Sequence, residues 1–176
     1  MKINGEFVPG VESWASLSIM KTEEDIVNDF ITNLDGSITE VGFIPRPTDQ
    51  RVSFSMFFQD YIPNNPNYKM HLNLVYGTGL SFGPPNSEKH EDILKIPDYR
   101  RVDIGFSVLL KGENKRSRIN WLNIFESIWV SAEVFNLLDI NNTVSYLWVT
   151  DITGREYAVP NYLTSRQLNT KLILTF

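Results

Sequence analysis

The sequence contains no cysteine, which excludes disulfide bonds, thiolate metal sites and cysteine nucleophiles. Histidine occurs only twice, at His71 and His90, so a histidine-rich metal centre is excluded as well. Acidic residues outnumber basic ones by 21 to 16, and a net charge of −5 argues against a nucleic-acid partner. No apolar run reaches the length of about 18 residues that a transmembrane helix needs. The first residues, Met1 to Phe7, also lack the apolar core of a signal peptide.

Alanine, the best helix former, is nearly absent, whereas aromatic residues make up 12% of the chain. This balance favours strands. Six segments alternate apolar and polar residues with the period of a half-buried strand. They span residues 13–20, 51–60, 68–81, 100–110, 127–136 and 166–176. The sequence therefore predicts an all-β, antiparallel fold.

The connections between these segments differ in length. Three long ones cover residues 21–50, 83–98 and 139–165, and they alternate with the connections 61–67 and 111–125. Loops of nearly 30 residues are unusual in a compact domain and are often functional. In the first, the segment from Thr22 to Asp25 matches the start of a capped helix. In the third, residues 143–160 predict a hairpin that turns between Asp151 and Gly154.

Alternation alone does not identify the solvent that the apolar face meets. A soluble sandwich buries that face in a core, whereas a transmembrane barrel turns it toward lipid. Several segments have the nine to eleven residues that cross a bilayer at a tilt. Their polar faces carry charges in mid-strand, at Arg101, Asp103, Glu133 and Lys171, which a lumen tolerates and lipid does not. Long loops on one side and shorter ones on the other also favour a barrel.

Seven stretches carry a resemblance to a known family, over nearly the whole chain. They are residues 10–18, 44–51, 58–63, 72–80, 97–106, 131–138 and 171–176. In their order they resemble the C-terminal end of a TonB-dependent outer-membrane receptor of the Bacteroidetes type. The resemblance implies an up-and-down transmembrane barrel of 22 strands around a plug domain, of which this chain would supply the last six. Six strands do not close a barrel, so the remaining strands and the plug are expected upstream.

The resemblance also implies function and partners. It implies TonB-energised nutrient uptake across the outer membrane, without catalysis and without a cofactor. The expected partners are the rest of the barrel, the plug, the TonB complex acting through that plug, the barrel assembly machinery and outer-membrane lipid. The sequence leaves open whether a surface lipoprotein lid is present. The last strand resembles the signal read by the barrel assembly machinery, through Leu168, Thr170, Leu172, Leu174 and Phe176. Two alternatives stay open: an outer-membrane channel without TonB coupling, and a soluble β-sandwich binding module.

The sequence contains no catalytic constellation. His71, Asp103 and Glu133 are expected on the lumen-facing side, as single polar residues rather than as acid–base or metal groups. The substrate-contact candidates are Tyr146, Trp148 and Tyr157 in the last long loop, which could equally hold the loop hairpin together. Glycan, siderophore, peptide and cobalamin substrates are all compatible with the sequence.

Overall fold

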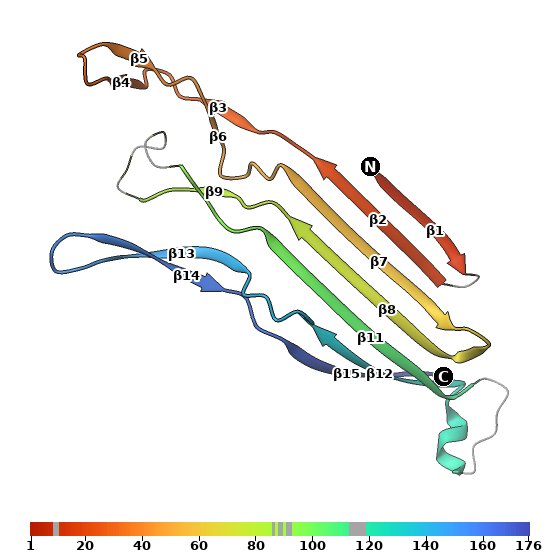
Figure 1. Ribbon diagram of the computed structural model, residues 1–176. Coiled ribbons are helices and arrows are strands. Elements are labelled where there is room, and N and C mark those ends of the chain that lie inside the picture. Colours follow the sequence, from red (N-terminus) through yellow and green to blue (C-terminus); the bar gives the residue numbers. More distant parts are fainter. Residues whose placement is uncertain (9–10, 86, 88–89, 91–92, 113–118) are drawn as a thin grey trace.

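The computed structural model consists mainly of one seven-stranded antiparallel sheet (Figure 1). It describes all residues except 9–10, 86, 88–89, 91–92 and 113–118, so parts of the connections 83–98 and 111–125 lie outside the described residues. The sheet order is β1-β2-β7-β8-β11-β12-β15, so each strand pairs with its predecessor and its successor in the meander. The strands are β1 (Lys2–Val8), β2 (Val11–Ile19), β7 (Val52–Ile62), β8 (Asn65–Gly77), β11 (Tyr99–Lys111), β12 (Ser127–Phe135) and β15 (Gln167–Thr175).

Five of the six segments expected from the alternation coincide with one of these strands to within two residues, and the all-β, antiparallel class is confirmed. The sixth, 68–81, runs too far, because β8 ends at Gly77 and Ser81 already belongs to a separate short strand. The sheet has a seventh strand, β1, which the sequence analysis missed because Gly5 and Glu6 interrupt the alternation there. The predicted connection 61–67 shrinks to a tight turn at Pro63 and Asn64. Proline presets the first position of such a turn, and Asn64 accepts a φ of 62° at the second.

Three long loops leave the same end of the sheet (Figure 1). The first contains β3 (Glu23–Asp25) paired with β6 (Phe43–Pro45), and β4 (Phe30–Thr32) paired with β5 (Ile38–Glu40). The second contains β9 (Ser81–Phe82) paired with β10 (Leu94–Lys95). The third is a hairpin of β13 (Thr143–Thr150) and β14 (Glu156–Tyr162). We call this the outer end, and the opposite end, with the β7–β8 turn and the 3-10 helix η1 (Asn120–Ile124), the inner end.

Two local expectations for these loops have opposite outcomes. The short helix expected to begin at the capping pattern from Thr22 to Asp25, with Ile26, Phe30 and Ile31 as its apolar positions, is wrong. Glu23–Asp25 pairs as β3 with β6 and Phe30–Thr32 pairs as β4 with β5, and this pairing overrides the capping pattern. The hairpin expected within residues 143–160 is confirmed. Its turn is held by Asp151, whose carboxylate accepts hydrogen bonds from the backbone N–H groups of Thr153 and Arg155, while Gly154 adopts a φ of 81°.

The strand register separates the sheet into an apolar and a polar face. On one face Phe58, Leu72, Ile104, Val134 and Leu168 lie opposite one another on five neighbouring strands. One residue further along each strand, on the other face, the corresponding row is Gln59, His71, Gly105, Glu133 and Asn169. Because successive side chains point to opposite faces, most of the sheet keeps this separation. Exceptions are Asp60, opposite Met70 on the apolar face, and the row Leu109, Trp129 and Ile173 on the polar face.

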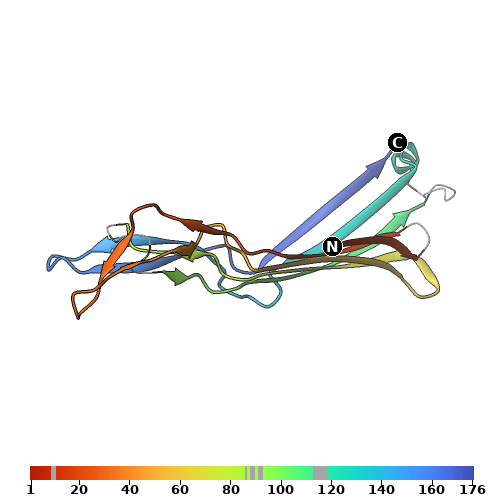
Figure 2. The same ribbon diagram turned by 90° about the horizontal axis from the view of Figure 1, so that it is seen from above.

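The sheet is a single open layer that curves between β1 and β15 (Figure 2). Among the described residues, the only buried hydrophobic side chains are Ile44 and Ile128. The accessible surface is 12510 Å², whereas a compact monomer of 20.3 kDa has roughly 8,800 Å². Both faces of the sheet therefore lack a second layer within the described chain, and β1 and β15 remain edge strands.

Isolated in buffer, the chain should not persist as a folded monomer. Its two edge strands present unpaired backbone groups, and its apolar face has no covering layer, so aggregation or edge-to-edge self-pairing is expected. Size-exclusion chromatography with light scattering, followed by urea unfolding, measures this. A monodisperse monomer that unfolds cooperatively would contradict the expectation and favour a soluble domain.

Candidate functional site

The polar face carries its first network around Asp103, on β11. This carboxylate is only 5% exposed. One oxygen accepts hydrogen bonds from Arg101 Nε at 2.7 Å and from the backbone N–H of Asn136 at 2.9 Å. The other accepts one from Asn73 Nδ2 at 3.1 Å. The charge is therefore paired within the sheet, and the network joins β8, β11 and the end of β12 without leaving a carboxylate available for acid–base chemistry.

A second network crosses four strands along the row of His71, Gly105, Glu133 and Asn169. Gly105 has no side chain, and the imidazole of His71 lies over it, so that its Nε2 reaches Glu133 Oε1 at 3.9 Å. Asn169 Nδ2 donates a hydrogen bond of 2.9 Å to the other oxygen of Glu133. The ring of Phe57 lies 5.9 Å from the imidazole. These contacts connect four neighbouring strands from β8 to β15. They are possible because Gly105 on β11 leaves room for the His71 imidazole to reach β12.

Replacing Gly105 by alanine should destabilise the sheet, because the new Cβ would collide with the His71 imidazole. Overpacking of this kind costs about 1–3 kcal/mol. The matched control is Gly5→Ala in β1, where a Cβ meets nothing within 4 Å and the effect should stay near zero. Urea unfolding of the full-length protein measures both changes.

The collision also predicts coupling between the two positions. In a double-mutant cycle, His71→Ala should relieve most of the cost of Gly105→Ala, because it removes the colliding ring. Additive effects of the two substitutions, or equal losses for Gly105→Ala and Gly5→Ala, would contradict the proposed packing.

Polar side chains fix the base of the first outer loop. The fully buried carboxylate of Asp49 accepts hydrogen bonds from the backbone N–H of Thr22 at 2.7 Å and from Arg51 Nε at 2.6 Å. The Thr22 bond, with a further contribution from Arg51, holds the pKa of Asp49 below its ordinary value. The two ends of this long loop are therefore held together where they leave the sheet.

The other two loops are fixed in the same way. Asp98 accepts a hydrogen bond from the Gly79 backbone N–H at 3.1 Å and another from the Tyr76 hydroxyl at 2.9 Å, which together lower its pKa, the Gly79 bond most. Asn142 exchanges two hydrogen bonds with the backbone of Arg100, at 2.8 and 2.9 Å, as a neighbouring strand would. All three outer loops thus start from defined positions on the sheet.

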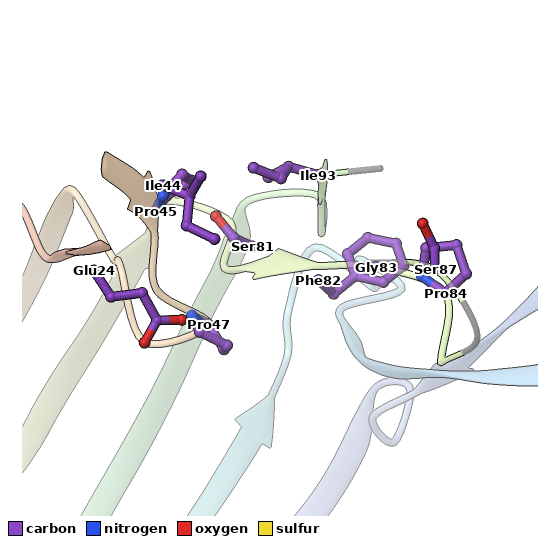
Figure 3. Close-up of a pocket in the computed structure, with 10 residues that line it drawn as sticks. All are labelled: Glu24, Ile44, Pro45, Pro47, Ser81, Phe82, Gly83, Pro84, Ser87 and Ile93. Atoms are coloured by element: carbon purple, nitrogen blue, oxygen red, sulfur yellow. The ribbon is translucent and has the colours of Figure 1, made fainter. Parts of the chain in front are cut away.

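A hollow of about 130 Å³ lies between the first and second outer loops (Figure 3). Prolines, an aromatic ring and aliphatic side chains form most of its walls, with a carboxylate and two hydroxyls among them. The lining residues are Glu24, Ile44, Pro45, Pro47, Ser81, Phe82, Gly83, Pro84, Ser87 and Ile93. Ile44 on β6 and Ser81 on β9 point toward one another in this view, and both are buried. The hollow is therefore assembled from two loops that are distant in the sequence.

Aromatic stacking connects this hollow with the third outer loop. Phe82, a lining residue, stacks on Tyr146 of β13 with 4.5 Å between ring centroids and 3° between planes. Trp148 lies 6.3 Å from the same ring. Tyr157 is opposite Val149 in the hairpin, so it lies on the other face from Tyr146 and Trp148 and is 50% exposed. Two of the three aromatic candidates therefore gather beside the hollow, and the third does not.

Ser81 and Phe82 were not among the residues singled out from the sequence. Ser81 is the last residue of the predicted strand 68–81 and Phe82 follows it, and nothing in the local pattern distinguishes the two from ordinary strand residues. Their importance arises from contacts with the first and third loops, which are set only by the fold.

The last strand places the expected assembly residues on one exposed row. Leu168, Thr170, Leu172 and Leu174 lie opposite Val134, Ala132, Val130 and Ile128 of β12, on the apolar face. Phe176 follows on the same side of the chain and packs against Phe125, with 4.9 Å between ring centroids. Trp121 of η1 meets Phe125 edge-on at 6.4 Å. The row therefore ends in an aromatic cluster at the inner end.

Nothing in the described part of the chain resembles a metal centre, since no group of three or more metal-binding side chains occurs there. In the same residues, no helix has the length and apolarity to span a membrane. No family model, curated protein or solved structure matches the chain.

Proposed function

We propose that this chain is the C-terminal part of the transmembrane barrel of a TonB-dependent outer-membrane receptor. The observation that carries the proposal is the two-faced, single-layer sheet. Its six C-terminal strands follow one another in antiparallel order and have nine to thirteen residues each, and the last five share an apolar row on one face, from Phe58 to Leu168. Such strands match the length and alternation that a bilayer requires.

The apolar face supports lipid as its solvent. Leu17, Met70, Phe106, Val130 and Leu172 are large apolar side chains on this face that stay exposed. In water such a surface carries a free-energy cost, whereas lipid tails remove that cost. A soluble sandwich would need a second sheet over this face, but the three long loops extend beyond the outer end of the sheet (Figures 1 and 2).

The polar face supports a lumen. Its charged side chains are engaged inside the sheet, Asp103 in an ion pair with Arg101 and Glu133 in a hydrogen bond from Asn169, as a plugged, hydrated interior permits. Lys69 lies over the rings of Tyr61 and Trp129, at 4.9 and 4.4 Å from their centroids. This face would meet the plug domain, through which the TonB complex acts.

The difference between the two ends of the sheet, long structured loops at the outer end and shorter connections at the inner end, supports the binding of a substrate at the outer end. Three loops with their own secondary structure converge at the outer end, with a hollow between two of them and aromatic stacking to the third. In the proposed role the chain contributes barrel wall and substrate-receiving loops without performing catalysis, and a surface lipoprotein could close over these loops.

The gene itself provides the first test. We expect the reading frame to extend upstream into further strands, a plug domain and a signal peptide. The full-length product should then fractionate with the outer membrane, migrate faster on gels before boiling than after, and lose nutrient uptake when the TonB complex is deleted. Upstream sequence that encodes a second soluble sheet, together with a soluble product, would contradict the proposal.

A further inference from the structure

We infer that the inner end of the apolar face binds the phosphate group of an anionic glycerophospholipid from the membrane leaflet at that end. The inference rests on the proposed function, because it requires lipid beside this face of the sheet. Two features meet at the site: a buried lysine, Lys111, and an aromatic cluster formed by Trp121, Phe125 and Phe176.

A β-bulge directs Lys111 to the apolar face. In the regular part of β11, odd-numbered residues such as Ser107 lie on the polar face. Between Leu109 and Lys111 the register shifts, so that Lys111 lies opposite Ile128. Ile128 also pairs with Leu174 in the apolar row, and residues directly opposite one another share a face of the sheet. Bulges re-aim side chains in this way, and this one puts a cation on the face that would meet lipid.

The ammonium group of Lys111 lacks a counter-ion. The residue is 8% exposed, and its Nζ donates a hydrogen bond to the carbonyl oxygen of Phe125. Within the described residues, no carboxylate forms an ion pair with this ammonium. An ammonium group has three donors, and a buried charge without a counter-ion is unfavourable. A ligand that brings an anionic oxygen to Lys111 would therefore remove this cost.

The aromatic cluster indicates that the ligand is amphipathic. Trp121 and Phe176 remain 62% and 75% exposed, although both rings pack on Phe125. Ile124 of η1 is 69% exposed. In both views η1 lies beside the end of β15, and the Phe125–Phe176 contact connects the cluster to the apolar row of that strand (Figures 1 and 2). Aromatic rings are favoured at the level of lipid headgroups, where one end meets acyl chains and the other meets water.

The two features together match a phospholipid. Because the Phe125 carbonyl accepts the Lys111 hydrogen bond, the ammonium lies beside the aromatic cluster. In a phospholipid the phosphate is joined to glycerol and acyl chains, so one molecule pairs the ammonium and covers the rings. Free phosphate would leave the rings in water. Lys111 is a cation without a paired carboxylate, so a headgroup of net negative charge is favoured over a zwitterionic one.

The test compares two lipids around the full-length receptor in vesicles. Phosphatidylglycerol and phosphatidylcholine, each brominated in its acyl chains, are mixed in turn into phosphatidylcholine vesicles, and quenching of a fluorophore on Leu110→Cys measures their relative occupancy. Leu110 precedes Lys111 and is 66% exposed. We expect a preference for phosphatidylglycerol of roughly 5-fold, the order that one lysine near an anionic lipid contributes. A label at Phe106, further along the apolar face, should show no preference.

Substitutions of the lysine test its role. Lys111→Gln should abolish the preference at Leu110, whereas Lys111→Arg should retain it. The matched control is Lys171→Gln, which removes a lysine from the polar face of β15 and should change nothing. The comparison of the two labels in the otherwise unchanged receptor does not depend on how Lys111→Gln folds.

Three results would overturn the inference: equal occupancy by the two lipids at Leu110, a preference that Lys111→Gln leaves intact, or a preference that inorganic phosphate abolishes at constant ionic strength. The last would indicate a site for free anions. Absence of quenching at Phe106 by either lipid would contradict the receptor assignment itself. Quenching at Phe106 without a preference at Leu110 would contradict this lipid site alone.

Discussion

Met56→Arg should lower the stability of the full-length receptor in a bilayer by about 2–4 kcal/mol, the cost of a cation at the lipid-facing midplane of a barrel. Met56 lies in the middle of β7, and its cross-strand neighbours on the apolar face are Ala15 and Leu74. No acidic side chain is paired with it there. Urea unfolding of the receptor in phosphatidylcholine vesicles, compared with the unchanged protein, measures the loss.

The adjacent residue provides the matched control. Ser55 occupies the polar face of the same strand, opposite Ser16 and Val75, and is about as exposed as Met56. Ser55→Arg puts the same cation one residue away but on the other face, where a loss below about 1 kcal/mol is expected, as for most surface substitutions. Equal losses for the two variants would contradict the assignment of the faces.

Deletion of Phe176 should sharply reduce the amount of receptor in the outer membrane and increase its degradation in the periplasm. The apolar row of β15 ends in this residue, which packs on Phe125 at the inner end. β15 has one unpaired edge, so an assembly factor could add a strand to it and read alternate side chains. Immunoblots of fractionated membranes measure the level.

Two further variants separate assembly from simple packing. Leu174→Asp puts a charge on the same apolar row and should also lower the membrane level, whereas Thr175→Ser, on the opposite side of the strand, should not. Normal levels after both the Phe176 deletion and Leu174→Asp would reject a role of this row in assembly.

The strands of the sheet could be predicted because their pattern is local. In segments such as residues 100–110, each residue's neighbours in sequence already determine its face, and the sheet register preserves that alternation. β1 lacked a strong local pattern and is recognised only by its pairing with β2. The segment from Thr22 to Asp25 carried a helix-capping pattern that long-range pairing with β6 overrode.

The contacts of the candidate site could not be predicted, because they join residues that are far apart in the sequence. The His71 imidazole lies over Gly105 and contacts Glu133 only because the register of three strands places these residues in one row. The stacking of Phe82 on Tyr146 depends on how two outer loops meet. Aromatic content alone suggested Tyr146 and Trp148, but it also suggested Tyr157, which the hairpin places on its other face.

The central claim is that one face of this sheet meets lipid. Its most direct test is fluorescence quenching by lipids brominated in their acyl chains, with single cysteines labelled in the full-length receptor in vesicles. Labels at Phe106 and Val108 should be quenched strongly, whereas labels at Ser107 and Ser55 on the polar face should be quenched little. Equal quenching at both pairs, or none at Phe106 and Val108, would contradict the account.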